Sequence, residues 1–279
     1  MKCAWNELTQ ILPTWVRNQL TEYDATQCLE IRLRVQRPAQ LVLKDGERWL
    51  TGQTKAEDLH PVINRASQYS PWASATISEG YITVTGGHRI GIAGECVIQK
   101  GSVTTIRRVT SVCIRVARDI HGICAELKNI RDSILILGPP GSGKTTLLRE
   151  LIRARSNQVN RTVAVVDERR ELFPEGFELG RRTDVIYGCR KADGIEMAVR
   201  CLSPDTVAVD EITSAADCNA LCQSAWCGVF LLATAHANSV QDLSRRSIYT
   251  PLLKDRLFET VILLNKDRTF TLERIGNIR

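Results

Sequence analysis

The segment at 138–145 reads GPPGSGKT, and it lies between an apolar run, SILIL at 133–137, and a stretch of helical composition that starts at Thr146. Its spacing matches GxxxxGK[ST], a pattern in which glycines let the backbone wrap around phosphates with its N–H groups pointing inward. A helix that begins at the loop adds the positive end of its dipole. The segment therefore predicts a phosphate-binding loop (P-loop) within an α/β domain.

The residue types in this loop predict how a nucleoside triphosphate would be held. Lys144 is expected to reach the β- and γ-phosphates, and Thr145 is expected to ligate Mg²⁺. ATP and Mg²⁺ are therefore the expected cofactors. The predicted nucleotide-contacting residues of the loop are Gly138, Pro139, Pro140, Gly141, Ser142, Gly143, Lys144, Thr145 and Thr146.

The two parts of the chain differ in pattern. Residues 126–279 alternate apolar strands (at 133–138, 162–168, 206–211 and 229–236) with helical stretches, which is typical of a mostly parallel sheet with crossover helices. Residues 1–125 instead combine an expected amphipathic helix over 5–20 and a polar helix over 55–69 with short strands and glycine-turned hairpins. We predict an α/β P-loop domain over 126–279, preceded by a smaller α+β domain over 1–125.

Three predicted strands of the second domain end in polar side chains: Asp167 with Glu168, Asp210 with Glu211, and Thr234 with His236. The carboxyl ends of parallel strands meet at one edge of a sheet, where ligands gather. At that edge Asp210 is expected to hold the metal, and Glu211 is expected to polarise the attacking water. Acidic pairs are also a common turn composition, and a histidine after a strand is most often structural.

The order of these motifs resembles the secretion ATPase superfamily, which powers type II and type IV secretion and pilus machines. GPPGSGKT, VVDERRE, VAVDE and LLATAHANS stand where that superfamily has its Walker A loop, Asp box, Walker B strand and His box. The segments EIRLRVQRPAQLVL, GHRIGIAGE and SVCIRVAR extend the resemblance, within its sporulation members, into the first domain. It implies a RecA-like ATPase core.

The resemblance also implies roles for individual residues. Glu211 would be the catalytic carboxylate, assisted by Lys144 and by Glu168 of the Asp box. His236 would face the γ-phosphate. The metal-side residues would be Thr145, Asp210 and Asp167, and the arginines of the first domain that could reach the nucleotide are Arg107, Arg108, Arg115 and Arg118, of which Arg115 and Arg118 are preferred.

One motif departs from the superfamily pattern. Its Walker B strand commonly continues as Gly-Glu-Ile-Arg, whereas this chain has Asp210, Glu211, Ile212 and Thr213. The chain thus gains a carboxylate on the metal side and loses an arginine. Any role of that arginine in coupling subunits does not carry over.

The assembly implied by the resemblance is a ring of identical chains, expected to be a hexamer, with each nucleotide held between a P-loop domain and a neighbouring first domain. Its partners would be stage III sporulation membrane proteins of a channel between mother cell and forespore. The chain has no apolar stretch of the ~18 to 20 residues that span a bilayer and no signal peptide. We therefore expect a cytoplasmic protein on the mother cell side that reaches the forespore membrane through partners.

Two alternatives remain at this stage. A RecA-like core also drives nucleic-acid-stimulated motors, and the net charge of +6 is mildly basic. Aromatic residues make up only 5% of the chain, and no stacking platform or basic stripe appears, so nucleic acid is not an expected partner. The other alternative is a scaffold that binds nucleotide only to assemble. The ten scattered cysteines, without a CxxC pair, are expected to be reduced thiols.

Overall fold

The fold is taken from a computed structural model, which describes residues 1–279 except 24, 68–76, 79, 128 and 275–279. The chain forms two compact units, one of residues 1–119 with 174–177 and one of residues 120–173 with 178–279. The division falls at 119/120, rather than at the predicted 125/126, because residues after 119 bond to the second unit. Cys124 Sγ, for example, donates to the carbonyl of Glu150 at 3.6 Å.

The expected helix over 5–20 is two helices, α1 (Trp5–Ile11) and α2 (Thr14–Gln19). Pro13 separates them, because proline has no N–H to donate and stands at the N-cap of α2. The apolar face is nevertheless as predicted, since Leu8, Leu12 and Val16 are buried. The polar helix is α3 (Ala56–Ser67), and the end of its predicted range lies outside the described residues.

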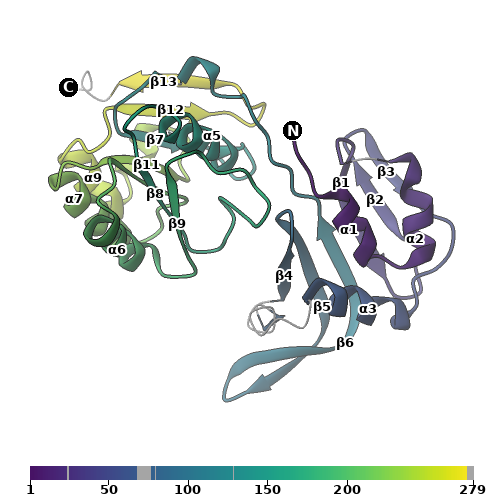
Figure 1. Cartoon of the computed structure of the whole chain (residues 1–279). Helices are drawn as coiled ribbons and strands as arrows, with labels where there is room; N and C mark the ends of the chain where they lie inside the picture. Colours follow the sequence, from purple (N-terminus) through teal and green to yellow (C-terminus); the bar gives the residue numbers. More distant parts are fainter. Residues whose placement is uncertain (24, 68–76, 79, 128, 275–279) are drawn as a thin grey trace. The chain divides into compact units, whose positions relative to one another are not determined.

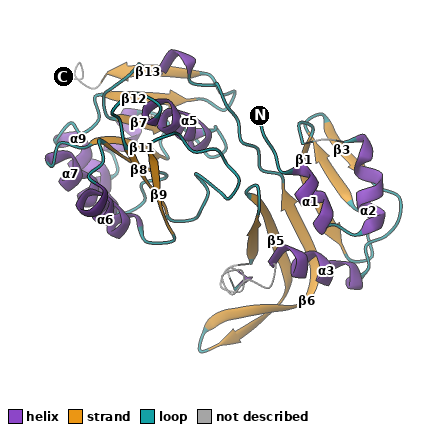
Figure 2. Ribbon diagram, viewed as in Figure 1, coloured by secondary structure: helices purple, strands orange, loops and turns teal. Residues whose placement is uncertain are grey.

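The first unit is built on a six-stranded sheet with the order β3-β2-β1-β6-β5-β4, and its paired strands are antiparallel. The predicted glycine turns connect β4 to β5 and β5 to β6. Strands β5 and β6 form the long hairpin in Figure 2. Pro174–Phe177 also belong to this unit, where the N–H of Gly86 donates to the carbonyl of Glu175 at 2.8 Å. The strands are β1 (Cys28–Arg34), β2 (Gln40–Leu43), β3 (Gly46–Trp49), β4 (Tyr81–Val84), β5 (His88–Gln99) and β6 (Ser102–Arg115).

The second unit has a seven-stranded sheet with the order β13-β12-β7-β11-β10-β8-β9 (Figure 1). Six strands run parallel, and only β13, at one edge, is antiparallel. The mostly parallel sheet predicted from the alternating pattern is confirmed. The strands are β7 (Ile134–Leu137), β8 (Val163–Asp167), β9 (Thr183–Tyr187), β10 (Thr206–Val209), β11 (Phe230–Ala235), β12 (Thr260–Leu264) and β13 (Phe270–Arg274).

Helices cover both faces of this sheet, so its central strands are mostly apolar and are buried at nearly every position. Leu135 and Leu137 of β7 belong to one core cluster with residues of α6, α7 and α9. Because side chains alternate along a strand, Ile134 and Ile136 point to the opposite face. The helices are α5 (Lys144–Ser156), α6 (Lys191–Leu202), α7 (Ala215–Trp226), α8 (Val240–Ser244) and α9 (Thr250–Lys254), with 3-10 turns at Leu20–Glu22, Ala125–Leu127 and Ser247–Tyr249.

Three strands of the second unit, β9, β12 and β13, were not among those predicted. The segment of β9 includes the charged side chain of Asp184, and the β12–β13 hairpin follows the last recognised motif. All ten cysteines are free thiols. Within the described residues, no helix combines the length and the apolar character needed to cross a membrane.

Candidate functional site

The predicted P-loop connects β7 to α5, as its sequence requires. Gly143, at the N-cap of α5, has φ of 100°, a left-handed conformation that side chains disfavour. A Cβ atom added to Gly138 would lie 2.6 Å from the carbonyl oxygen of Leu264, so the loop passes too close to β12 for any larger residue. The Ser142 hydroxyl is buried and has no hydrogen-bond partner among the described residues. Such a loop has the open cradle and the spare donor that a phosphate needs.

Lys144 is buried at the start of α5, and its ammonium group is fully engaged. Nζ lies 2.9 Å from the carbonyl oxygen of Gly138, 3.0 Å from that of Pro139, and 3.0 Å from Nδ1 of His236. Burial lowers the pKa of this ammonium group, and the nearby carboxylates of Asp210 and Glu211 oppose that shift.

Asp210 follows β10 and lies directly beside the P-loop. Its Oδ2 accepts from the Thr145 hydroxyl at 2.6 Å, and its Oδ1 accepts from the Thr234 hydroxyl at 2.5 Å. Thr145 and Asp210 thus form the pair that P-loop proteins use to hold Mg²⁺ with phosphate and water. No group of three or more histidine, cysteine or acidic side chains that could hold a metal occurs in the described part of the chain. The pair therefore fits a magnesium ion that takes its other ligands from a bound nucleotide.

Thr234, which is fully buried, connects the ends of β10 and β11. Its hydroxyl donates to Asp210 and also accepts from the backbone N–H of Glu211 at 2.8 Å. Glu211 has φ of 54°, an unfavourable value for a residue with a side chain. Strain of this kind is concentrated at functional sites.

The His236 ring bridges the P-loop and the end of β10. Its Nδ1 contacts Lys144, and its Nε2 lies 3.2 Å from Oε1 of Glu211. Both ring nitrogens therefore contact other site residues rather than groups of the core. The side chain is about one third exposed. The structure thus joins three predicted site residues in one chain of contacts, Lys144 to His236 to Glu211.

These residues line a cavity of about 670 Å³, a size usual for small-ligand sites. Its lining includes every predicted residue of the P-loop from Pro140 to Thr146, together with Asp210, Glu211, Thr234 and His236. The sequence reasoning missed seven further lining residues, of which Leu147 directly follows the P-loop. Glu171 follows the Asp box, and the other five lie outside every recognised motif: Ile120, Ile123, Leu264, Arg268 and Phe270.

The Asp box residues are bound to other groups in this structure. The Asp167 carboxylate accepts from the backbone N–H groups of Glu171, Leu172 and Phe173 at 2.8 to 3.0 Å. Burial raises its pKa, while these three hydrogen bonds lower it. Both Asp167 oxygens are used in this way and the residue does not line the cavity, which differs from the expected metal-side position.

Glu168 is held by an ion pair. Its Oε2 lies 2.7 Å from Nζ of Lys191, a buried lysine at the start of α6. Glu168 likewise does not line the cavity, so its predicted catalytic role would require a change of partner. Lys191 was not predicted, because no motif marks it.

The candidate arginines lie in the first unit, each with a local partner. Arg118 donates to the carbonyl oxygens of Ala25 and Cys28. Arg115 Nε lies 3.6 Å from Glu30 Oε1, and its side chain is 69% exposed. Arg107 and Arg108 both pair with Glu95. Contact of Arg115 or Arg118 with a nucleotide therefore stays a prediction.

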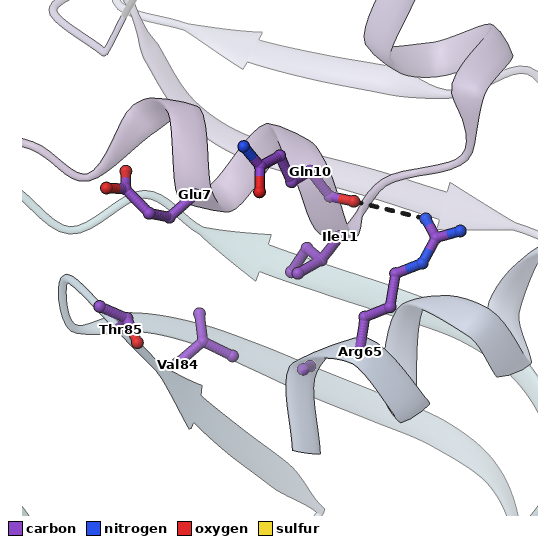
Figure 3. Close-up of a pocket in the computed structure, with 7 residues that line it drawn as sticks. Glu7, Gln10, Ile11, Arg65, Val84 and Thr85 are labelled. Carbon is purple, nitrogen blue, oxygen red and sulfur yellow. Dashed lines mark hydrogen bonds between the residues drawn. The ribbon is translucent and has the colours of Figure 1, made fainter. Parts of the chain in front are cut away.

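A second cavity, of about 280 Å³, lies within the first unit between α1, α3 and β4 (Figure 3). The guanidinium of Arg65 faces it, but Nη1 already donates to the carbonyls of Gln10 and Leu12, each at 3.3 Å. None of the predicted site residues lines this cavity. The cavity beside the P-loop is therefore the candidate site.

Comparison with known proteins finds relatives that match almost the whole chain. The family described as sporulation stage III, protein AA matches residues 4–276. The stage III sporulation protein AA of Bacillus subtilis (strain 168) is 36% identical over 280 residues, which cover 94% of this chain and 91% of that protein.

Two solved structures share the fold. The Legionella pneumophila ATPase DotB aligns over 94% of this chain and 80% of its own, with a TM-score of 0.64 and 17% identity. The pilus retraction motor PilT, solved with bound ADP, aligns over 89% of this chain and 76% of its own, with a TM-score of 0.62 and 16% identity. The second unit, with its preceding antiparallel domain, therefore has the fold of the secretion ATPases.

Proposed function

The chain belongs to the sporulation stage III, protein AA family, and on that premise we propose that it binds ATP with Mg²⁺ beside the P-loop and hydrolyses it. One observation carries the proposal: Lys144, Thr145, Asp210, Glu211 and His236 come from the P-loop and two neighbouring strand ends, and all line one cavity. Phosphoryl transfer to water requires a cation, a pair of side chains that hold Mg²⁺, and a carboxylate, and all of these line one cavity. The fold shared with ATPases supports the proposal.

In the proposed reaction, water attacks the γ-phosphorus, and the bond from that phosphorus to the bridging oxygen of ADP breaks. Glu211 orients the water and accepts its proton, so ADP and phosphate are the products. Lys144 leaves His236 to contact phosphate oxygens. Mg²⁺, held by Thr145 with Asp210, would supply neutralisation of phosphate charge.

His236 would act as the sensor of the γ-phosphate. Its two contacts, to Lys144 and Glu211, both involve residues that the nucleotide engages. Arrival of the triphosphate would release the ring from Lys144, and loss of phosphate would let that contact form again. Glu168, Arg115 and Arg118 stay proposed contributors, whereas we propose that Asp167 positions the loop at 171–173 through its three hydrogen bonds.

We propose that several identical chains assemble as a ring, a hexamer by resemblance, and that hydrolysis drives a partner complex. The partners would be stage III sporulation membrane proteins of a channel between mother cell and forespore, contacted from the cytoplasmic mother cell side. The name of the Bacillus subtilis relative supports the sporulation role. Two structural neighbours, an ATPase and a pilus retraction motor, support a mechanical role.

The test is phosphate release by the full chain with ATP and Mg²⁺, measured beside ADP binding. Glu211→Gln should keep binding and lower turnover by about 100-fold or more. Lys144→Ala should weaken binding as well. The matched control is Glu196→Gln, an exposed residue on α6, which should leave turnover unchanged. Turnover that survives Glu211→Gln and Lys144→Ala would contradict the assignment.

Two further measurements separate the alternatives. Binding without turnover in the wild type, at any protein concentration, would favour a nucleotide-gated scaffold. Strong stimulation by single-stranded DNA would contradict the secretion role and favour a nucleic-acid motor. Native mass in the presence of a slowly hydrolysed ATP analogue tests the ring, and a monomer under all conditions would exclude it.

A further inference from the structure

The lining of the cavity beside the P-loop falls into two chemical sets. The polar set comes mainly from the P-loop and from the ends of β10 and β11, and it also includes Glu171, after β8, and Arg268, in the β12–β13 turn. Apart from Pro140 and Leu147 of the P-loop region, the apolar set consists of Ile120, Ile123, Leu264 and Phe270, from the segment before β7 and from the β12–β13 hairpin. In the sheet order, β11 and β12 flank β7 on opposite sides. The P-loop at the end of β7 therefore stands between the polar strand ends and the apolar hairpin.

Three of these four apolar residues are more accessible than core residues of the same types. Ile123 is 44% exposed, and Phe270 and Ile120 are half-buried, whereas Leu264 is nearly buried. Phe270 and Leu264 are directly opposite each other in the antiparallel pair of β13 and β12. Apolar side chains gathered at the wall of a ligand-sized cavity favour contact with an apolar or planar part of a ligand.

The hairpin side of this wall is held rigidly against the P-loop. Leu263 of β12 is in register with Leu137, the last residue of β7. The next residue, Leu264, places its carbonyl oxygen 2.6 Å from where a Cβ of Gly138 would lie. The position of Phe270 relative to the phosphate loop is therefore set by strand pairing.

The other side of the wall is tied to α5, the helix that follows the P-loop. The N–H of Gly122 donates to the Glu150 carboxylate, and Arg153 Nη1 donates to the carbonyl of Ile120 at 3.2 Å. Glu150 and Arg153 also form a buried ion pair at 2.9 Å. Two buried charged residues thus hold Ile120 and Ile123 beside the loop, a use that no recognised motif indicated.

We propose that Ile120, Ile123, Leu264 and Phe270 form the nucleobase subsite of this cavity, and that it selects purines by apolar contact and stacking. This inference rests on the proposed nucleotide binding. A triphosphate anchored at Lys144, on one side of the P-loop, leaves its base to be held elsewhere in the cavity. These four side chains offer no hydrogen-bonding group, so they would hold the base by contact area. Arg268, in the turn between Leu264 and Phe270, is the polar side chain in this part of the lining.

The test compares binding of Mg²⁺-ADP with binding of Mg²⁺-tripolyphosphate, which has no base, by calorimetry on the full chain. Phe270→Ala should weaken ADP by about 5- to 100-fold, the range expected for loss of base stacking. Its affinity for tripolyphosphate should stay within about twofold, since the phosphate contacts are unchanged. Phe270→Trp keeps an aromatic ring and should bind ADP about as well as the wild type. The matched control is Leu272→Ala, on the same strand, exposed and outside the cavity lining, which should alter neither ligand.

A second variant guards against misfolding of the hairpin. Ile123→Ser, at an exposed position of the other wall, should also weaken ADP selectively. In competition, GTP should displace ADP nearly as well as ATP does, and CTP should be weaker, because a pyrimidine buries less surface against these side chains than a purine does. Equal loss of both ligands in Phe270→Ala, unchanged ADP affinity in both variants, or CTP equal to ATP would overturn the subsite. Failure of the wild type to bind either ADP or tripolyphosphate would instead overturn the proposed function.

Discussion

Nζ of Lys144 lies 3.0 Å from Nδ1 of His236, although the two residues are 92 positions apart in the chain. The same ring reaches Glu211 through Nε2. The residues that we propose bind phosphate and activate water are thus connected by one imidazole. If these roles hold, the arrangement would tie the occupancy of the phosphate site to the position of the proposed base.

His236→Ala should separate nucleotide binding from turnover. The variant removes the ring between Lys144 and Glu211 but leaves the P-loop backbone intact, so we expect ADP affinity within about threefold and turnover lowered by roughly 10- to 100-fold. Phosphate release and calorimetry measure the two effects. The control is His60→Ala, an exposed histidine on α3. Unchanged turnover in His236→Ala would count against the sensor role.

Glu211→Gly should lose activity and gain stability. Glu211 has φ of 54°, and glycine avoids that cost but adds freedom to the unfolded chain, so the net gain should be about 0.5 to 1 kcal/mol. Hydrogen exchange of the β10 amides measures the opening free energy. Glu211→Gln keeps the strain and should leave this value unchanged. A glycine variant less stable than wild type would show that the conformation is not strained.

The ion pair between Glu168 and Lys191 provides a test of the predicted catalytic role of Glu168. If Glu168 acts on the nucleotide, Glu168→Gln should lower turnover by about tenfold or more, and Lys191→Met, which only frees the carboxylate, should not. Losing one partner of a pair this buried should cost Lys191→Met roughly 1 to 3 kcal/mol of stability. Equal loss of turnover in both variants, with matching loss of stability, would assign Glu168 to the ion pair alone.

Asp205 should make the stability of the second unit depend on acid pH. Its Oδ2 accepts from the backbone N–H and the hydroxyl of Thr162, both at 2.8 Å, and these bonds, the backbone one first, hold its pKa below the usual 3.8. A carboxyl with a lowered folded-state pKa stabilises the fold above its unfolded-state pKa and loses that effect as pH falls through the folded value.

The measurement is the urea midpoint of wild type and Asp205→Asn from pH 7 down to pH 2. The wild-type advantage at pH 7 should be about 0.5 to 1 kcal/mol, a modest value because the carboxylate is partly exposed. It should shrink below pH 3.8, the ordinary pKa of the group. Asp184→Asn, an exposed position on β9, serves as the control at neutral pH. A difference that stays constant over the whole range would refute the linkage.

Much of the fold and site was predictable because it depends on local patterns. The apolar strands that end at Asp210 and His236 follow from composition and length, and the P-loop follows from its spacing. The break between α1 and α2 could also have been found, since Pro13 stands in the expected helix. The strands β9, β12 and β13, at the two ends of the sheet order, were harder to predict, because a strand is stabilised by neighbours that a local pattern does not contain.

The sequence by itself determined that the P-loop, the Thr145–Asp210 pair and His236 lie at one edge of the sheet. Parallel strands bring their carboxyl ends together whatever the details of packing. Only the tertiary structure decided which groups each side chain meets there. Asp167 bonds three backbone N–H groups, and His236 joins Lys144 to Glu211. Phe270 lines the cavity because β13 pairs with β12. A local sequence pattern does not contain these contacts, because they depend on distances between residues far apart in the chain.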